Sequence, residues 1–283
     1  MRAEKRPRHT YKPHIKPIVI MAVGVLLSSI YGKVDTTMLG MMSGDRNTGL
    51  YTNGLKIVDM VITTSTAVTA VFMPRLSFYF EHDKKKFIKL IRSGNDILSF
   101  ITFPFAVGLF VIAPKAIELL FGNEFAGSVP IIRILCILIV VKGFGNLLCF
   151  QLVMCTGNEK ERIPATFLGS LSNVIMNAVL IPVASGIGAA FASVVSESIV
   201  NGYQFFKMKK KVDIQFDKGI LLKSIFSSTV MGSICYFVGK IEMSLLLSTV
   251  FTALCGIFVY FLMNAILKNS MLEEILELVK TRD

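Results

Sequence analysis

The chain has 283 residues, of which 53% are hydrophobic, and it carries a formal net charge of +11. A mean hydropathy of +0.64 is too high for a soluble domain of this length and indicates a protein that crosses the membrane several times. The charge therefore does not indicate a nucleic-acid-binding protein, because the basic residues follow the predicted membrane topology.

Residues 1–16 form a polar, basic leader. The apolar run 18–30 that follows has roughly the shape of a signal peptide. No small-x-small cleavage site follows it, and the helical pattern continues to Leu39. The sequence therefore predicts an uncleaved first membrane span.

Eight apolar stretches predict an all-α polytopic membrane helix bundle, because lipid offers backbone groups no outside hydrogen-bond partner. Most of the 30 Lys and Arg residues fall in alternate gaps between the stretches, so the positive-inside rule predicts that both termini are cytoplasmic. The predicted spans are 17–40, 56–78, 95–113, 129–152, 163–182, 186–206, 219–239 and 244–267.

Three segments outside the spans have helical spacing. Residues 81–96 predict a cytoplasmic interfacial helix that leads into the third span. Residues 114–128 predict a short interfacial helix on the outer face that closes at Gly122. Residues 269–282 predict an amphipathic helix at the membrane surface.

The five cysteines lie in or beside the spans without a CxxC spacing, and we interpret them as small hydrophobic residues. The three histidines lie in predicted cytoplasmic segments, and the sequence has no DxD pair. We therefore predict no metal site and no catalytic residue. A membrane-embedded transferase is the less favoured alternative, because it needs poised carboxylates or histidines.

Ionisable residues inside a bilayer are costly and mark candidate cavity residues. Lys33 and Asp35 line a cavity in one interpretation and lie at the outer interface in another. Asp59, beside Lys56, is better explained by snorkelling to the interface. Lys142 lies in the middle of a span, where an ammonium needs a carboxylate partner or an anionic ligand.

Glu197 either pairs with Lys142, as a structural ion pair or in transport, or binds a coupling cation. Asn173 and Asn177 lie one turn apart and share a helix face, and Asn146 and Gln151 lie close on another. These amides either join helices by hydrogen bonds or recognise sugar hydroxyls. Arg75 either contacts a substrate pyrophosphate or is a topology signal.

Several short patterns recur in a fixed order along residues 15–206, about two thirds of the chain. They resemble the Wzx-like polysaccharide flippases of the MATE-like multidrug/oligosaccharidyl-lipid/polysaccharide (MOP) exporter superfamily. The patterns are VDTTMLGMMSG at 34–44, GLYTNGLKIVD at 49–59, MPRLS at 73–77, LFGNEFAGSVPIIRIL at 120–135, TGNEK at 156–160, NxxxNxxLIP from Asn173, and GIGAAFASVVSE at 186–197.

The resemblance implies a fold and a set of segments. Residues 17–206 are similar to the second six-helix lobe of such a flippase, and 207–267 to the two helices that longer members add. Residues 1–16 then resemble the linker between lobes, and 268–283 form a cytoplasmic tail. The chain resembles one half of the family's architecture, so the resemblance implies a first-lobe partner or a longer native chain.

The function implied by the resemblance is translocation of undecaprenyl-diphosphate-linked oligosaccharide units across the bacterial cytoplasmic membrane by alternating access. Its partners are the lipid-linked oligosaccharide and membrane lipids, without nucleic acid. It needs no cofactor beyond a possible coupling cation, Na⁺ or H⁺. The alternatives are a cation-coupled multidrug exporter of the same superfamily and an inactive or assembly remnant of a split gene.

Overall fold

The computed structural model describes residues 12–241 and 243–280, with side chains for residues 19, 22, 32–241, 243–274 and 277. All regular elements in these ranges are helical. Six helical segments there are long and apolar enough to cross a membrane. They contain α1 (Lys12–Ala70), α3 (Lys84–Phe121), α4 (Ser128–Gly145), α6 (Arg162–Lys209), α7 (Lys218–Val238) and α8 (Leu245–Ile266).

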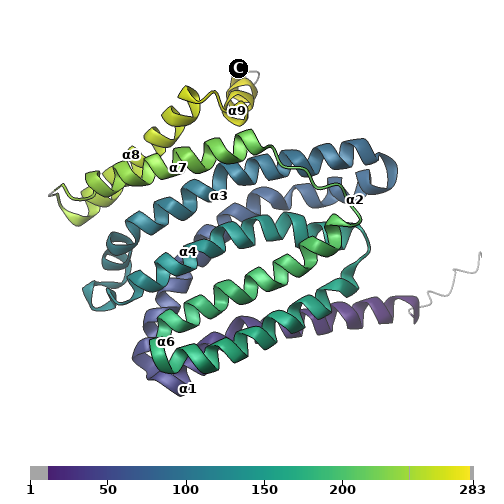
Figure 1. Cartoon of the computed structure of the whole chain (residues 1–283), viewed down its shortest axis with the longest axis horizontal. Coiled ribbons are helices and arrows are strands. Elements are labelled where there is room, and N and C mark those ends of the chain that lie inside the picture. The colour runs from purple at the N-terminus through teal and green to yellow at the C-terminus, as the bar shows by residue number, and fades with distance from the viewer. Residues whose placement is uncertain (1–11, 242, 281–283) are drawn as a thin grey trace, which may run out of the picture.

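Helices α1 and α6 are each long enough to cross a membrane twice. A straight helix of the 59 residues of α1 would be about 88 Å long, more than twice the thickness of a bilayer. Instead, α1 leaves helical geometry at Gly44 (φ 81°, ψ 173°) and α6 at Ser185 (φ 46°, ψ −125°), and each helix doubles back there (Figure 1). Counted by arms, the described residues make the eight predicted passes.

We call residues 12–43 and 45–70 the first and second arms of α1, and 162–184 and 186–209 those of α6. Figure 1 shows α4 in the middle of the bundle, with α6 and the first arm of α1 on one side and α3, α7 and α8 on the other, while the second arm of α1 passes behind α4. The largest buried cluster joins α1, α4 and α6 and includes Leu39, Tyr51 and Ile132. Because lipid is as apolar as these side chains, close van der Waals packing holds the arms together.

The second predicted span, 56–78, is broken. Helix α1 ends at Ala70, and α2 (Phe72–His82) follows after Val71. The break has a covalent cause, since Pro74 has no N–H to donate to the carbonyl of Ala70. Val71 keeps helical backbone angles, so Arg75 lies on α2 just past a one-residue interruption, within the candidate span Gly32–His82.

The predicted interfacial helix 81–96 is wrong as a separate element. Asp83 lies between α2 and α3, and its side chain accepts a hydrogen bond of 3.0 Å from the backbone N–H of Lys86 at the start of α3. From there α3 runs on into the membrane, because no glycine kink or proline interrupts its first five turns. The basic residues 84–92 are thus the first turns of a spanning helix.

The prediction for 114–128 was right about its end and wrong about its start. Helix α3 continues through Pro114 to Phe121 and ends at Gly122, whose φ of 90° suits glycine. A 3₁₀ turn, η1 (Asn123–Phe125), then leads to α4. Proline inside the helix removes a single hydrogen bond, and Pro104 is tolerated in the same way.

The fourth pass changes its pitch near the end. Helix α4 passes into a π-helical turn, η2 (Asn146–Gln151), and then into α5 (Leu152–Cys155). A 3₁₀ turn, η3 (Glu159–Glu161), connects α5 to α6. The π turn directs Asn146 and Gln151 toward the end of α1, as described below.

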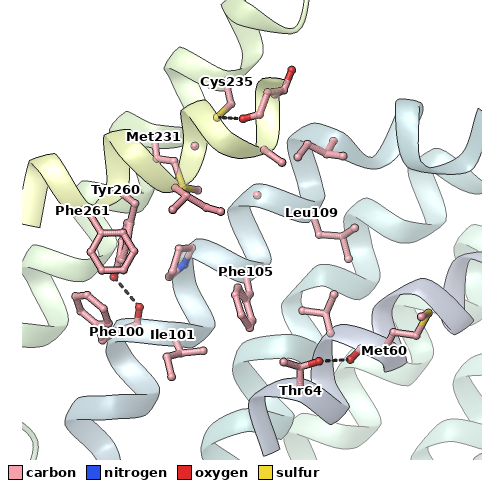
Figure 2. A pocket seen from close by; sticks show the side chains of 18 of the residues that line it. Met60, Thr64, Phe100, Ile101, Phe105, Leu109, Met231, Cys235, Tyr260 and Phe261 are labelled. Atoms are coloured by element: carbon pink, nitrogen blue, oxygen red, sulfur yellow. Dashed lines mark hydrogen bonds between the residues drawn. The ribbon is translucent and has the colours of Figure 1, made fainter. Parts of the chain in front are cut away.

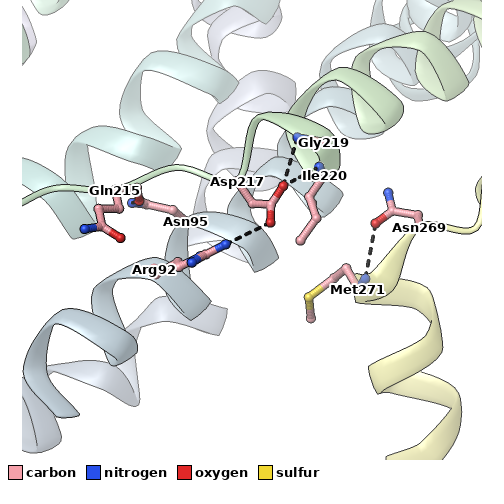
Figure 3. A network of polar contacts seen from close by, with 8 residues as sticks. All are labelled: Arg92, Asn95, Gln215, Asp217, Gly219, Ile220, Asn269 and Met271. Atoms are coloured by element: carbon pink, nitrogen blue, oxygen red, sulfur yellow. Dashed lines mark hydrogen bonds and ion pairs between the residues drawn. The ribbon is translucent and has the colours of Figure 1, made fainter. Parts of the chain in front are cut away.

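Helices α7 and α8 pack mainly against α3 and each other. The linker from α6 is held on α3 by two contacts (Figure 3): Arg92 pairs with Asp217 at 3.0 Å, and Asn95 donates to the carbonyl of Gln215 at 3.0 Å. Asp217 also caps α7 by accepting from the backbone N–H groups of Gly219 and Ile220. These contacts fix the register of α7 against the bundle.

The predicted tail helix is confirmed as α9 (Ser270–Lys280), which packs on α8 with Met271 and Leu272 buried. Of the predicted leader, residues 12–16 belong to α1, whereas residues 1–11 lie outside the described residues, as do 281–283. Because α2, the α6–α7 linker and α9 lie at one end of the bundle, we call it the basic end. The end with Gly44, Gly122 and Ser185 is the turn end.

Candidate functional site

The carboxylate of Asp35 is the most highly coordinated polar group between the arms of α1 and α6. Its Oδ1 accepts from the side-chain amides of Asn173 at 2.8 Å and Asn177 at 2.7 Å. Its Oδ2 accepts from the hydroxyls of Tyr51 at 3.0 Å and Ser193 at 2.6 Å. Asp35 is half-buried, while Tyr51, Asn173 and Asn177 are fully buried.

The five residues come from four different arms. Asp35 lies on the first arm of α1 and Tyr51 on the second, while the two asparagines lie on the first arm of α6 and Ser193 on the second. The Asp35 side chain points between the arms of α1 and α6, although Lys33, two residues earlier, is exposed. The structure thus joins Asp35 to the predicted Asn173 and Asn177 and separates it from Lys33.

Sequence analysis missed Tyr51 and Ser193. The signal that could have found them is their spacing: Tyr51 follows Asp35 by the same number of residues as Ser193 follows Asn177. Two residues placed symmetrically about a tight turn meet across a helical hairpin. The sequence does not predict the turns at Gly44 and Ser185, and without these turns the spacing indicates no contact.

The cluster offers hard oxygen donors to a monovalent cation. Around the carboxylate lie two hydroxyls and two amides, and an amide that rotates by 180° presents its carbonyl oxygen in place of its NH₂. The Oδ1 of Asn177 is buried without a hydrogen-bond partner. The described residues contain no group of three or more His, Cys, Asp and Glu side chains that could hold a metal ion.

A stripe of polar side chains runs along the exposed face of the second arm of α1. It comprises Lys56, Asp59 and Thr63, which are all exposed although they lie within a membrane-crossing arm. Lys142 on α4 is half-buried and interacts electrostatically with the carboxyl of Asp59. We call Lys56, Asp59, Thr63 and Lys142 the polar face.

Asn146 serves to join helices. Its side-chain oxygen accepts from the hydroxyl of Thr69 at 3.1 Å and from the amide of Gln151 at 2.9 Å. Gln151 also donates to the carbonyl of Thr69 at 2.9 Å. The π turn therefore holds the end of α1 just before the break at Val71, which agrees with the interpretation of these amides as interhelical contacts.

Two further predicted residues lie away from the Asp35 cluster. Glu197 is half-buried on the second arm of α6, where its backbone carbonyl accepts from the side chain of Asn201 at 3.0 Å. Arg75 is exposed on α2 at the basic end.

An apolar groove lies beside the polar face. It has a volume of about 560 Å³ and is bounded by the second arm of α1, α3, α7 and α8 (Figure 2). Figure 2 shows Met60 and Thr64 on the α1 side, facing Phe105 and Leu109 of α3. Met60 directly follows Asp59, so one arm carries both the polar face and a wall of the groove.

The family described as "Polysaccharide biosynthesis protein" matches residues 2–130. A probable lipid II flippase, MurJ, of Thermotoga maritima is 31% identical over 184 residues, which cover 62% of this chain and 37% of that protein. A probable low-salt glycan biosynthesis flippase of Haloferax volcanii is 20% identical over 212 residues, covering 73% and 44%. The chain spans less than half the length of these curated relatives.

Two solved structures share the fold. An inward closed conformation of the lipid II flippase MurJ superposes with a TM-score of 0.77 at 18% identity, covering 95% of this chain and 57% of that one. An outward-facing multidrug resistance MATE family transporter of the MOP superfamily gives a TM-score of 0.54 at 16% identity, covering 91% and 65%. These relatives are flippases and transporters, and none is an enzyme. The chain is thus similar in sequence to part of two flippases, and it shares its fold with part of a lipid II flippase and of a MATE family transporter of the MOP superfamily.

Proposed function

We propose that the chain forms one lobe of a flippase that moves undecaprenyl-diphosphate-linked oligosaccharide units across the bacterial cytoplasmic membrane for surface polysaccharide assembly. The names of the matched family and of the two flippase relatives support a lipid-linked saccharide as cargo. The relatives' cargoes differ from one another, so the sugar is left open.

The observation that carries the proposal is the adjacency of the polar face and the apolar groove on one helix arm. A lipid-linked saccharide has the same division, with a hydroxyl-rich head and a long apolar chain. Lys56 and Lys142 add positive charge beside Asp59, where a diphosphate is attracted. The groove opens a lipid-compatible path for the chain while the head crosses along the polar face.

The polar face also requires a cover. Exposed Lys and Asp side chains within a membrane-crossing arm are stable only against protein or a water-filled cavity. We infer that a first six-helix lobe, supplied by a partner or by a longer native chain, lies over this face. The two lobes then alternate access to the cavity between them by rocking, as in transporters built from repeats.

The membrane orientation follows from the distribution of basic residues. The basic end carries Lys84, Lys85, Lys86 and the run 207–211, so the positive-inside rule puts it and both termini in the cytoplasm. The turn end then faces outward. A cysteine introduced at Asn123 should react with an impermeant maleimide added to whole cells, whereas one at residue 159 should not.

A cation at Asp35 is the second part of the proposal. The carboxylate, the two hydroxyls and the rotated amides form an all-oxygen environment that suits Na⁺, and a proton on Asp35 is the alternative occupant. This cluster is also the observation that keeps a cation-coupled multidrug exporter as a second candidate. The exporter fold has the lower of the two TM-scores.

The test is a flipping assay with the affinity-purified chain and whatever partner copurifies, reconstituted in liposomes with a fluorescent lipid-linked oligosaccharide. We expect the complex to increase the fraction of fluorescent headgroups that a reagent outside the liposomes can reach. In liposomes without protein this fraction should stay at background. Mass spectrometry of the complex identifies the first lobe. Export of cationic dyes without flipping would favour the multidrug exporter, and absence of both activities would favour an assembly remnant.

A further inference from the structure

We propose that Tyr51 is a positioning residue that transmits cation occupancy of Asp35 to the second arm of α1, and hence to the polar face. This inference rests on the cation site proposed above and adds the route by which its occupancy acts. Among the described side chains, Tyr51 is the only residue of that arm hydrogen-bonded to Asp35. Its side chain is fully buried, with 0% of its surface exposed.

The hydroxyl protons in this cluster have two arrangements. With an ionised, empty Asp35, the hydroxyls of Tyr51 and Ser193 both donate to Oδ2, at 3.0 and 2.6 Å. The same hydroxyls have a second set of partners: the Tyr51 and Ser193 oxygens lie 2.9 Å apart, and Ser193 reaches the carbonyl of Ala189 at 2.9 Å.

A cation on the carboxylate selects the second arrangement. It repels the two hydroxyl hydrogens and attracts the oxygen lone pairs, so Tyr51 turns its proton to Ser193, and Ser193 turns its proton to Ala189. The Tyr51 oxygen then faces the cation. The cluster therefore has two states, and the choice between them depends on whether Asp35 is occupied.

The position of Tyr51 in the chain gives this change a mechanical consequence. Gly44 lies between Asp35 and Tyr51, and its φ of 81° marks the point where the two arms join. Tyr51 is on the same rigid arm as Lys56 and Asp59, within about 12 Å along the helix axis. When the Tyr51 hydroxyl changes its hydrogen-bond partner, it changes how tightly the second arm of α1 is held to Asp35. This arm carries the polar face.

The experiment compares Tyr51→Phe with Tyr260→Phe, in the full chain with its copurifying partner in nanodiscs. Tyr260 is a matched control, because it is also buried and donates one hydrogen bond, to the carbonyl of Phe100 at 2.7 Å, away from Asp35. The probes are Na⁺ affinity by titration and hydrogen exchange with and without Na⁺. K⁺ at equal ionic strength serves as the reference salt.

In the wild type and in Tyr260→Phe, Na⁺ should slow backbone hydrogen exchange in two segments, residues 173–193 and residues 52–66. In Tyr51→Phe, the affinity should fall about tenfold, as expected for one lost polar contact to a charged site. At saturating Na⁺, hydrogen exchange should still slow in residues 173–193 of this variant. In residues 52–66, Na⁺ should no longer change the exchange rate.

A Tyr51→Phe chain in which 52–66 still responds to Na⁺ as in the wild type would refute the role of Tyr51 while leaving the cation site intact. A wild-type chain in which neither segment responds to Na⁺ would overturn the cation site itself and this inference with it. A purely structural role would instead lower protection in both segments without Na⁺ and leave the difference between salts unchanged.

Discussion

The hydroxyl of Ser43 donates a hydrogen bond of 2.7 Å to the hydroxyl of Ser185, which links the turn of α1 directly to the turn of α6. Asp35 and Tyr51 are equally distant in sequence from Ser43, as Asn177 and Ser193 are from Ser185. Two helical hairpins are therefore joined at their turns and again at the Asp35 carboxylate. The turns set the register that brings the five polar residues together.

The turn of α1 should depend on glycine at position 44. Its φ of 81° and ψ of 173° lie in a region open almost only to glycine. An added Cβ would meet no atom within 4 Å, so the cost of Gly44→Ala is backbone strain alone, about 1–3 kcal/mol. Thermal unfolding in detergent should show a clearly lower midpoint for this variant.

Gly49→Ala is the matched control for Gly44→Ala. Position 49 is equally open around the Cβ and lies in regular helix, so alanine should be neutral or raise stability by about 0.5–1 kcal/mol. Equal midpoints for the two variants would show that Gly44 carries no conformational requirement.

Two substitutions at Asp35 should separate function from folding. Asp35→Asn keeps polar groups in contact with Tyr51, Ser193 and the asparagines, so the protein should insert and fold normally but lose Na⁺ binding. Asp35→Leu leaves the amides of Asn173 and Asn177 without that acceptor, at a cost of about 1–3 kcal/mol for each group left unsatisfied. Protein level, thermal midpoint and ²³Na NMR binding test both variants, and Na⁺ binding by Asp35→Asn would refute the cation site.

Lys142→Ala should lower surface polysaccharide without preventing membrane insertion. The ammonium interacts electrostatically with the carboxyl of Asp59 on the polar face, and its loss removes positive charge from the proposed path of the diphosphate. Surface polysaccharide and membrane protein level are the two measurements. Lys240→Ala, an exposed lysine at the turn end, should leave both unchanged. A normal amount of surface polysaccharide at a normal protein level in Lys142→Ala would contradict the proposal that Lys142 lines the substrate cavity.

The linker on α3 should loosen in acid. The backbone N–H of Ile220, then Arg92 and the N–H of Gly219, lower the pKa of Asp217 below its ordinary value. A carboxyl group whose pKa is lower in the folded state stabilises that state at pH values above its unfolded pKa, which is about 3.9 for Asp. This stabilisation is lost as the pH falls through the pKa of the folded state. Proteolysis of the linker should therefore be constant from pH 5 to 8 and rise below about pH 4.

Three variants separate the charge of Asp217 from its role as a helix cap. Asp217→Asn retains a good helix cap and loses only the charge, whereas Asp217→Ala loses both and should be about 1 kcal/mol less stable. Arg92→Gln should match Asp217→Asn, because each removes the same ion pair. A linker that is equally protected in all three variants would show that Asn95 and Gln215 suffice to hold it.

Composition and charge pattern predicted the number of passes and the spacing of the helices, because lipid restricts the backbone so strongly. The shared face of Asn173 and Asn177 was equally predictable, since it depends only on the helical repeat. The interruption after Ala70 was not predicted, although Pro74 is present in the sequence. A proline interrupts a helix only where the helix does not tolerate the lost hydrogen bond, and α3 tolerates Pro104 and Pro114.

The site itself was predictable only in part. Asp35 was recognised as a costly charge, but its depth depends on the turn at Gly44, which extends the first arm beyond the predicted end of the span at 40. The electrostatic interaction between Lys142 and Asp59 acts between α4 and α1, and no local pattern specifies which helices are neighbours. Ser185 carried no warning at all, because a non-glycine residue with positive φ has no signature in a single sequence.

The turns at Gly44 and Ser185 reverse the chain with almost no loop. At that end of the bundle, the connections with room for an independent conformation are short, around 122–127 and 239–244. In the proposed orientation, this part of the protein therefore presents antibodies and phages with very little variable peptide. Selection by such agents would find few independently variable residues in this part of the protein.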